Sequence, residues 1–253
     1  MMLDAIRREI DEIDDAILDL LVRRFAATGK VKATKFMDGS LSTSPFRPAR
    51  EAAMMRRLIT KGGRAIQPEV LVRLWRVILS ASTQSQAPVT LHVSEELGGD
   101  LACRLAISQH FCDMGVEIHD SCAKALDCLR DRRGDLAVFA TQSDWADGFL
   151  AAEAGGPSLI GSLPVTGGDG MPLLLVCGHA EPQETGEDET VIVSPERPRD
   201  LAPILWQARS GSCWLTGIPG YLDSSGWPLG DILQNMPGAK LAGRYPRALK
   251  APS

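Results

Sequence analysis

Two residue types that often carry enzyme chemistry are missing from the first third of this chain. Residues 1–87 contain no histidine and no cysteine. If this part is an enzyme, its chemistry therefore uses neither an imidazole for proton transfer nor a thiol nucleophile. Glycine and proline are also absent from residues 3–28, so nothing interrupts a helix over that stretch.

The chain also lacks the signals of a membrane or secreted protein. It has no run of about 18 apolar residues, so no membrane span is expected, and residues 1–15 are too charged for a signal peptide. Six cysteines form no CxxC pair and show no zinc-site spacing: Cys103, Cys112, Cys122, Cys128, Cys177 and Cys213. We therefore expect reduced thiols, a cytoplasmic protein, no metal and no cofactor.

Charge is unevenly distributed along the sequence. Residues 1–87 carry 15 Lys and Arg against 10 Asp and Glu, a net charge of +5. The remainder carries 27 − 15 = 12 basic and 32 − 10 = 22 acidic residues, a net charge of −10. A basic N-terminal part suggests an anionic ligand. Nucleic acid is disfavoured as that ligand, because acidic residues are interspersed and no aromatic platform accompanies the cations.

One long helix is predicted over residues 3–35. Its apolar seam consists of Ile6, Ile10, Ile13, Ile17 and Leu20, at alternating steps of four and three. The next seam position is Arg24, and Lys35 lies within about 20° of the same face. Because an unpaired buried charge is unfavourable, two cations on an apolar stripe indicate that an anion binds there. The alternative is a coiled-coil helix in which Arg24 has no special role. In either case the predicted helix is about 50 Å long, which is too long for one small domain to cover.

The rest of the chain divides at Pro88. Before it, helices are predicted from about residue 46 to Gly62-Gly63 and from Pro68 to residue 86. After it, a βαβαβ pattern over residues 89–141 and two strands near 157–165 and 171–178 indicate a small α/β lobe. An acidic linker (179–189) precedes a strand (190–195), a helix (199–209), a strand (211–219), a helix (229–236) and a short end (239–246).

Polar residues of the helical part suggest a shared binding site. The set is Arg7, Arg24, Lys35, Arg50, Glu51, Ser82 and Gln86. Arg7 and Arg24 are about 25 Å apart on a straight helix, so they cannot grip one small molecule from the same chain. A two-fold dimer of antiparallel long helices would bring Arg7 of one chain near Arg24 of the other. Such a pocket suits a dianionic ligand.

Three segments carry a family resemblance. IRREIDEIDDAILDLLVRRFAATGKVKATK (6–35), PFRPAREAAMMRRL (45–58) and RLWRVILSASTQSQ (73–86) resemble the three helices of the all-helical chorismate mutases. The resemblance implies that Arg7 reaches into the partner's site, while Arg24 and Arg50 hold substrate carboxylates or support the site. Lys35 and Gln86 would bind the ether oxygen of chorismate. Glu51 would take the substrate hydroxyl, and Ser82 a carboxylate. Arg47-Pro48 departs from an acidic residue found in some members.

The chemistry implied by this family suits the residues. Rearrangement of chorismate to prephenate is pericyclic, so it requires no nucleophile and no proton shuttle. The enzyme has to hold a compact conformer and stabilise negative charge on the ether oxygen. Fixed Arg, Lys and Gln donors do both. A second interpretation is a catalytically silent relative that senses a metabolite or docks onto another pathway enzyme. Retention of Arg24, Lys35 and Gln86 favours the enzyme, because a silent relative needs no ether-oxygen clamp.

The second part resembles, more weakly, a reduced prephenate dehydratase with an ACT regulatory domain. GDLAVFATQSD (134–144), PSLIGSLPV (157–165) and LLLVCG (173–178) resemble dehydratase core strands. TVIVSPERPRDLAPIL (190–205) and AKLAGRYPRAL (239–249) resemble the start and end of an ACT domain. However, the catalytic Thr-Arg-Phe motif falls on Met171-Pro172-Leu173, which has no hydroxyl or guanidinium. The motifs of phenylalanine binding are likewise replaced, at 199–201 and 219–222.

The predicted fold is therefore α plus α/β. Residues 1–87 form a three-helix mutase domain intertwined with a partner. Residues 88–180 form a reduced dehydratase-like α/β lobe, and 181–253 form a linker and a degenerate ACT-like α+β segment. The expected partners are chorismate and a second copy of the chain with shared active sites, without nucleic acid or membrane.

Overall fold

The computed structural model describes the chain except residues 1, 38–44, 152–154, 168–169, 200–202 and 250–253; for residues 31–37 it describes the backbone alone. The helices are α1 (Met2–Met37), α2 (Pro48–Gly62), α3 (Pro68–Gln86), α4 (Glu95–Gly99), α5 (Leu101–Phe111), α6 (Cys122–Asp131), α7 (Ala146–Ala151) and α8 (Leu229–Asn235). The strands are β1 (Thr90–Ser94), β2 (Gly115–His119), β3 (Leu136–Ala140), β4 (Ser158–Leu163), β5 (Leu174–Gly178), β6 (Asp188–Ser194), β7 (Trp206–Ser210), β8 (Cys213–Pro219) and β9 (Lys240–Pro246).

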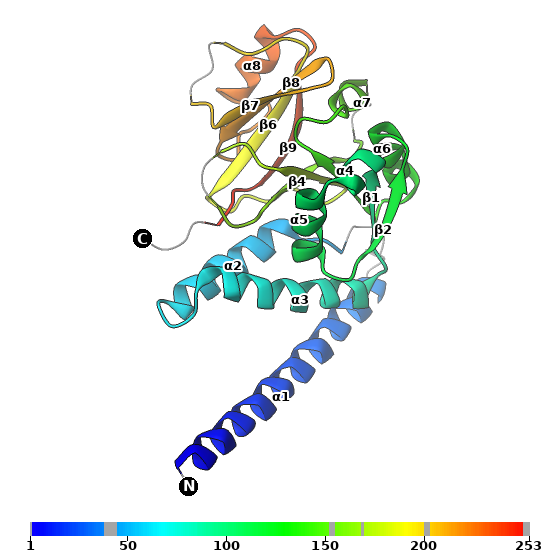
Figure 1. Cartoon of the computed structure of the whole chain (residues 1–253). Coiled ribbons are helices and arrows are strands. Elements are labelled where there is room, and N and C mark those ends of the chain that lie inside the picture. The colour runs from blue at the N-terminus through cyan, green and yellow to red at the C-terminus, as the bar shows by residue number, and fades with distance from the viewer. Residues whose placement is uncertain (1, 38–44, 152–154, 168–169, 200–202, 250–253) are drawn as a thin grey trace.

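The helical part begins with α1, which projects away from the rest of the molecule as a long rod (Figure 1). The predicted helix is present, and α2 and α3 start at Pro48 and Pro68, as proline at the first helical position favours. Gly63, with φ of 54°, ends α2 in a conformation that glycine adopts without strain. α2 and α3 pack on each other through a small core that includes Met55, Ile59 and Leu71.

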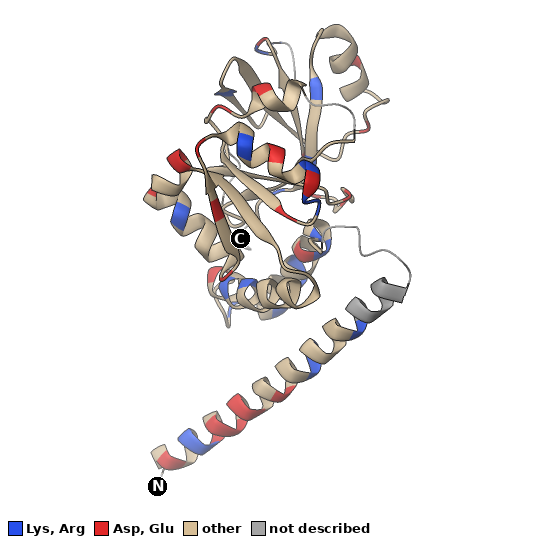
Figure 2. Ribbon diagram, turned by 90° about the vertical axis from the view of Figure 1, so that its right-hand side faces the viewer, with Lys and Arg blue, Asp and Glu red and all other residues tan. Residues whose placement is uncertain are grey.

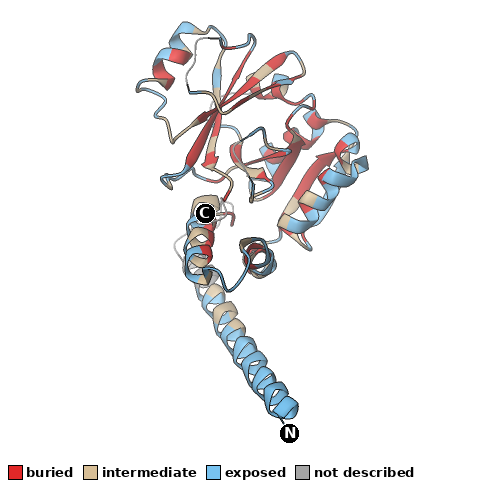
Figure 3. Ribbon diagram, turned by 60° about the vertical axis from the view of Figure 1, so that its left-hand side comes forward, coloured by how far each residue is buried: buried red, intermediate tan, exposed pale blue. Residues whose placement is uncertain are grey.

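The seam of α1 is not covered within one chain. Ile6, Ile10, Ile13, Ile17 and Leu20 are 46–58% exposed. Figure 3 shows pale blue over most of α1 and red concentrated in the sheet. Acidic and basic residues both occur along this helix (Figure 2), so it does not present a continuous basic stripe. α1 contacts α3, and Arg24 on α1 bonds to Ser82 on α3.

The second part is built on a nine-stranded sheet in the order β2-β1-β3-β5-β4-β9-β6-β8-β7. The predicted βαβαβ unit is present: β1 pairs in parallel with β2 and β3, and α4, α5 and α6 form the connections. β3, β5 and β4 continue as antiparallel pairs. The sheet is therefore mixed, and it runs through both of the segments predicted after Pro88.

Apolar side chains cover both faces of this sheet. Leu126, Phe139 and Trp145 belong to the core on the side of α6 and α7. Leu91 and Phe111 belong to the core on the side of α4 and α5, and Phe46, which precedes α2, is part of the same core. The helical part is thus anchored on the sheet by a buried aromatic side chain.

One prediction for the last part is wrong. A helix was expected over 199–209, but Trp206–Ser210 form β7, which pairs with β8. The Trp206 indole donates a 2.7 Å hydrogen bond to the buried carboxylate of Glu189, which a local helix would not provide. The short end at 239–246 is β9, which lies between β4 and β6. Its Gly243 permits close approach to β4, because a Cβ there would lie 2.1 Å from the Leu159 carbonyl oxygen.

None of the helices that the structure describes is long and apolar enough to cross a membrane.

Candidate active site

A polar cavity of about 440 Å³ lies where α1, α2 and α3 meet. It is lined by Arg24, Thr28, Pro45, Arg47, Arg50, Glu51, Met54, Leu79, Ser82, Thr83, Gln86 and Gln183. Five of the seven residues predicted from the sequence are in this set, although they come from three different helices. The remaining two are Arg7 and Lys35.

Arg24 and Ser82 are the best-defined pair in the cavity. The Arg24 guanidinium donates a 2.5 Å hydrogen bond to the Ser82 hydroxyl, which in turn donates to the Ile78 carbonyl at 2.7 Å. These contacts fix the end of the arginine against α3. The other guanidinium donors are free of this contact and can bind an anion in the bidentate geometry that suits a carboxylate.

Three arginines line this cavity. Burial lowers the pKa of Arg24, and the charge of Arg50 lowers it further. Arg47 lines the cavity as well. Because like charges repel and burial disfavours a charged group, the arrangement favours an anionic ligand that would relieve both effects.

Gln86 lies at the last position of α3 and lines the same cavity. Its side-chain amide donates a 3.2 Å hydrogen bond to the Ser82 carbonyl oxygen of its own helix. A ligand atom that accepts a hydrogen bond could use the second N–H of this amide. Lys35 is placed by its backbone near the end of α1, but its side chain lies outside the described residues.

Glu51 is engaged by a residue that the sequence did not single out. The Arg76 guanidinium donates to the Glu51 carboxylate at 2.8 Å and lies 3.2 Å from Nε2 of His110. Burial, and then the charge of Arg76, lower the pKa of His110 well below its usual value, so the neutral ring accepts this bond. Glu51 therefore links the cavity to α5 of the second part. Among the described lining residues it is the one acidic group, and its engagement leaves no metal-ligand set there.

Arg7 is not brought to the cavity within one chain. It lies in the projecting half of α1, about 25 Å from Arg24 by helical rise. Figure 1 shows this half of the helix well away from α2 and α3.

Gln183 reaches the cavity from the linker between β5 and β6, and no sequence pattern predicts this. The cause is a contact between distant segments. The Arg56 guanidinium, on α2, donates to the Thr185 hydroxyl and to the Glu187 carbonyl oxygen, both at 2.8 Å. These bonds hold the linker against α2. No periodicity or local motif encodes such a contact.

Comparison with known families agrees with this geometry. Residues 6–87 match the family model described as chorismate mutase type II. The helical part is a chorismate mutase domain. The mutase domain makes the chain an isomerase of aromatic amino acid biosynthesis, and chorismate is the substrate that this family implies.

The second part of the chain has no comparable assignment. No curated protein matches the chain. A solved structure titled "GqqA- a novel type of quorum quenching acylases" is 14% identical, with a TM-score of 0.39, over 62% of this chain and 94% of that one. That score is too low to establish a shared fold, so the region beyond the mutase domain is interpreted from its own residues.

Proposed function

We propose that the chain converts chorismate to prephenate in two equivalent sites of a two-fold homodimer, each built on the cavity of one chain and completed by the partner's Arg7. The observation that carries this proposal is the convergence of Arg24, Arg50, Ser82 and Gln86 on one cavity. A cavity of about 440 Å³ lined by Arg24, Arg47 and Arg50 suits a dianion of the size of chorismate.

The exposed seam of α1 supports the dimer. A stripe of four isoleucines and a leucine, about half exposed over about four turns, is unfavourable in water and indicates a helix partner. An antiparallel copy of α1 would cover this stripe. By two-fold symmetry it would also carry Arg7 of each chain to the Arg24 end of the other.

The proposed roles follow from the reaction. The rearrangement breaks the ether C–O bond and forms a C–C bond in one step, with no net proton transfer. Arg24, Ser82 and the partner's Arg7 would hold the carboxylates in the compact conformer. Lys35 and Gln86 would donate to the ether oxygen, on which negative charge grows in the transition state. Arg50 would support the carboxylate site, and Glu51 would take the substrate hydroxyl.

We also propose that the second part carries no dehydratase chemistry. Met171, Pro172 and Leu173 stand where a dehydratase has its threonine and arginine, and no side chain among them can replace a hydroxyl or a guanidinium. The purified chain should therefore accumulate prephenate from chorismate without forming phenylpyruvate. Appearance of phenylpyruvate would contradict this part of the proposal.

Complementation between two inactive variants tests the shared site. Arg7→Ala and Arg24→Ala should each lose most mutase activity. In a heterodimer of the two, one site has both arginines and the other has neither. Random pairing of equal amounts should therefore restore about a quarter of the wild-type activity. The two chains would carry different tags, so that isolated heterodimers can be assayed separately. Heterodimers no more active than their parents would overturn the shared site.

A further inference from the structure

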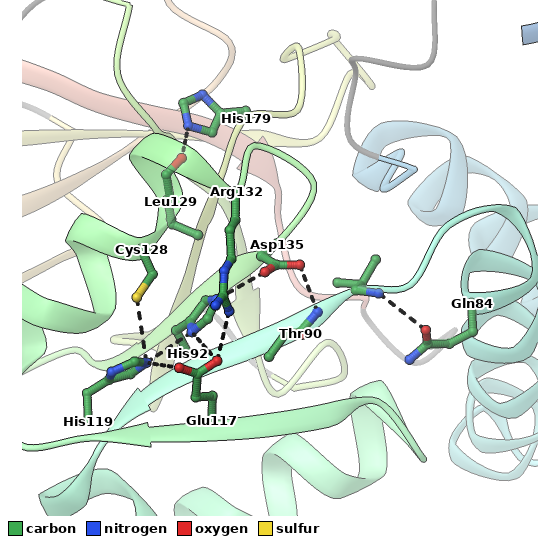
Figure 4. Close-up of polar contacts among 11 residues, drawn as sticks. Gln84, Thr90, His92, Glu117, His119, Cys128, Leu129, Arg132, Asp135 and His179 are labelled. Atoms are coloured by element: carbon green, nitrogen blue, oxygen red, sulfur yellow. Dashed lines mark hydrogen bonds and ion pairs between the residues drawn. The ribbon is translucent and has the colours of Figure 1, made fainter. Parts of the chain in front are cut away.

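Three potential metal ligands, none of which lines the mutase cavity, meet on one face of the sheet. They are His92 on β1, His119 at the end of β2 and Cys128 on α6, and their ligand atoms all lie within 4.8 Å of one another. Nδ1 of His92 is 3.0 Å from Nε2 of His119, which is 3.8 Å from Sγ of Cys128. Figure 4 shows the three side chains pointing toward one another.

The parallel pairing of β1 and β2 creates this convergence. His92 is in register with Glu117, and His119 follows Glu117 by two residues. Side chains two apart on a strand share a face, so His92, Glu117 and His119 project from the same side of the sheet. α6 crosses that side and supplies Cys128. The cluster therefore rests on rigid elements and not on a loop.

Glu117 offers a fourth ligand. Its carboxylate oxygens lie 3.8 Å from Nδ1 of His92 and 3.9 Å from Nε2 of His119. In a tetrahedral site with bonds of about 2.0–2.3 Å, ligand atoms lie about 3.3–3.6 Å from one another. Four of the six ligand–ligand separations, 3.0–3.9 Å, bracket that range, and Sγ of Cys128 lies within 4.8 Å of the ligand atoms of both histidines. No single Glu117 oxygen lies within 4.8 Å of all three other ligand atoms, so this carboxylate has to rotate toward them when an ion binds, and its 45% exposure leaves room for that rotation.

Outer partners orient two of these ligands. Asp135 lies 3.1 Å from Nε2 of His92 and also accepts a 2.9 Å hydrogen bond from the Thr90 backbone N–H. This carboxylate favours the tautomer with a proton on Nε2, which leaves the lone pair of Nδ1 directed at the cluster. Arg132 donates to the Glu117 carboxylate at 2.8 Å. Carboxylate–histidine–metal arrangements of this kind are typical of protein metal sites.

The alternative to a metal site is a hydrogen-bonded pair of histidines, in which His119 donates to His92. That alternative accounts for the 3.0 Å separation. It does not account for the Cys128 thiol, 3.8 Å from His119, or for the Glu117 carboxylate, which pairs with Arg132 but also lies 3.8–3.9 Å from both imidazoles. The convergence of two imidazoles, a thiol and a carboxylate is better explained by a cation.

We propose that His92, His119, Cys128 and Glu117 bind one Zn²⁺-class ion. Two nitrogens, one sulfur and one carboxylate oxygen suit zinc, whereas Mg²⁺ and Ca²⁺ require mainly oxygen ligands. His92 is fully buried, while the Glu117 side chain is 45% exposed, so the ion enters from the Glu117 side. Bound there, it ties the edge strand β2 and α6 to β1. The site shares no residue with the mutase cavity.

Cobalt is the probe that tests this proposal, because Co²⁺ reports a thiolate ligand by charge-transfer absorption in the near ultraviolet. The untagged full-length protein would be stripped with a chelator and titrated with Co²⁺, then with Zn²⁺. We expect one equivalent of Co²⁺, a thiolate charge-transfer band, and displacement by Zn²⁺. Absence of the band in the wild-type protein, or binding without a stoichiometric end point, would overturn the proposal.

Variants locate the ion. Cys128→Ser should abolish the charge-transfer band, and His119→Gln should weaken Co²⁺ binding at least tenfold. Asp135→Asn should keep the band and weaken binding about 10–100-fold, as outer partners of ligands do. Cys112→Ser and His179→Gln are matched controls outside the cluster, since His179 contacts the Leu129 carbonyl oxygen instead. Both should bind like the wild type, and circular dichroism would verify folding. Cys128→Ser that keeps the band, or controls that lose it, would contradict the proposed ligands.

Discussion

The helical part and the sheet part of this chain differ in how far one copy of the chain buries their apolar surface. In the sheet part both faces of the sheet are packed, and large side chains such as Phe139 and Leu159 are fully buried. In the helical part the longest helix has an apolar seam about half exposed and a cavity that lacks one predicted arginine.

This difference follows from what each part has to do. A stable scaffold is best built from one chain, because its core then forms without an encounter between molecules. A cavity for a dianion gains from cations on opposite walls, and antiparallel helices from two chains supply them by symmetry. We therefore expect substitutions in the helical part to affect assembly and catalysis together. Substitutions in the sheet part should affect mainly stability.

The largest effect is expected from charges on the seam of α1. Ile10→Glu combined with Ile17→Glu should give a monomer by analytical ultracentrifugation and reduce turnover to the uncatalysed rate. The reason is that each dimer would have to bury unpaired carboxylates, at several kcal/mol each. Leu101→Glu is the matched control, because it likewise replaces an exposed aliphatic side chain on a helix, and it should remain dimeric and active. A fully active monomer would show that one chain contains a whole active site.

Arg24→Ala comes next. Loss of a charged donor to the transition state removes about 3 kcal/mol or more of stabilisation, so kcat/KM should fall at least about a hundredfold. Arg23→Ala is the control, because this neighbour is exposed and is not part of the cavity lining. Chorismate disappearance followed by absorbance measures both. If the two variants have similar kcat/KM, the cavity is not the mutase site.

Gln86→Glu should convert a flat pH profile into a falling one. The amide of Gln86 donates a hydrogen bond at any pH, so wild-type kcat should change little from about pH 5 to 9. A carboxyl group donates only when protonated and has an unperturbed pKa of about 4.3. As pH rises through the pKa of the new carboxyl, the donor is lost, and activity should fall about tenfold per pH unit. A variant with a flat profile would mean that residue 86 does not donate to the ether oxygen.

The smallest effect is expected from Gln183→Ala, which tests whether the sheet part takes any share in catalysis. Gln183 is exposed at the cavity, and one neutral hydrogen bond contributes about 0.5–1.5 kcal/mol. KM for chorismate should therefore rise about two- to tenfold, with kcat nearly unchanged. Gln142→Ala, an exposed glutamine outside the lining, should leave KM as it is. Equal KM values for both variants would confine the active site to the helical part.

Sequence reasoning worked best where the signal is local. The bounds of α1, α2 and α3 follow from amphipathic spacing and, for α2 and α3, from glycine and proline at their ends, and most of the residues lining the cavity lie on those helices. It failed where neighbours in space decide the structure. Residues 206–210 form β7 because Trp206 packs against β8 and donates to Glu189, although the sequence pattern predicted a helix there.

The sequence likewise did not predict clusters whose residues come from separate helices and strands. His92, His119 and Cys128 are 27 and 9 residues apart, a spacing that matches no metal-binding motif. Only the register of β1 and β2, together with the crossing of α6, brings them together. Gln183 reached the mutase cavity for a similar reason, through the contacts of Arg56 with the linker.

The position of β9 also sets an order of events during synthesis of the protein. β9 is the last described strand, yet it lies between β4 and β6. Leu163 and Pro246, the ends of β4 and β9, are 246 − 163 = 83 residues apart. At about 5–20 residues per second, a ribosome takes about 4–17 s to cover that distance. Throughout this interval β4 has an open edge where β9 will pair, and β6 has one from the time it is made until β9 follows. A nascent chain held there for longer would be a substrate for chaperones that recognise unpaired strands.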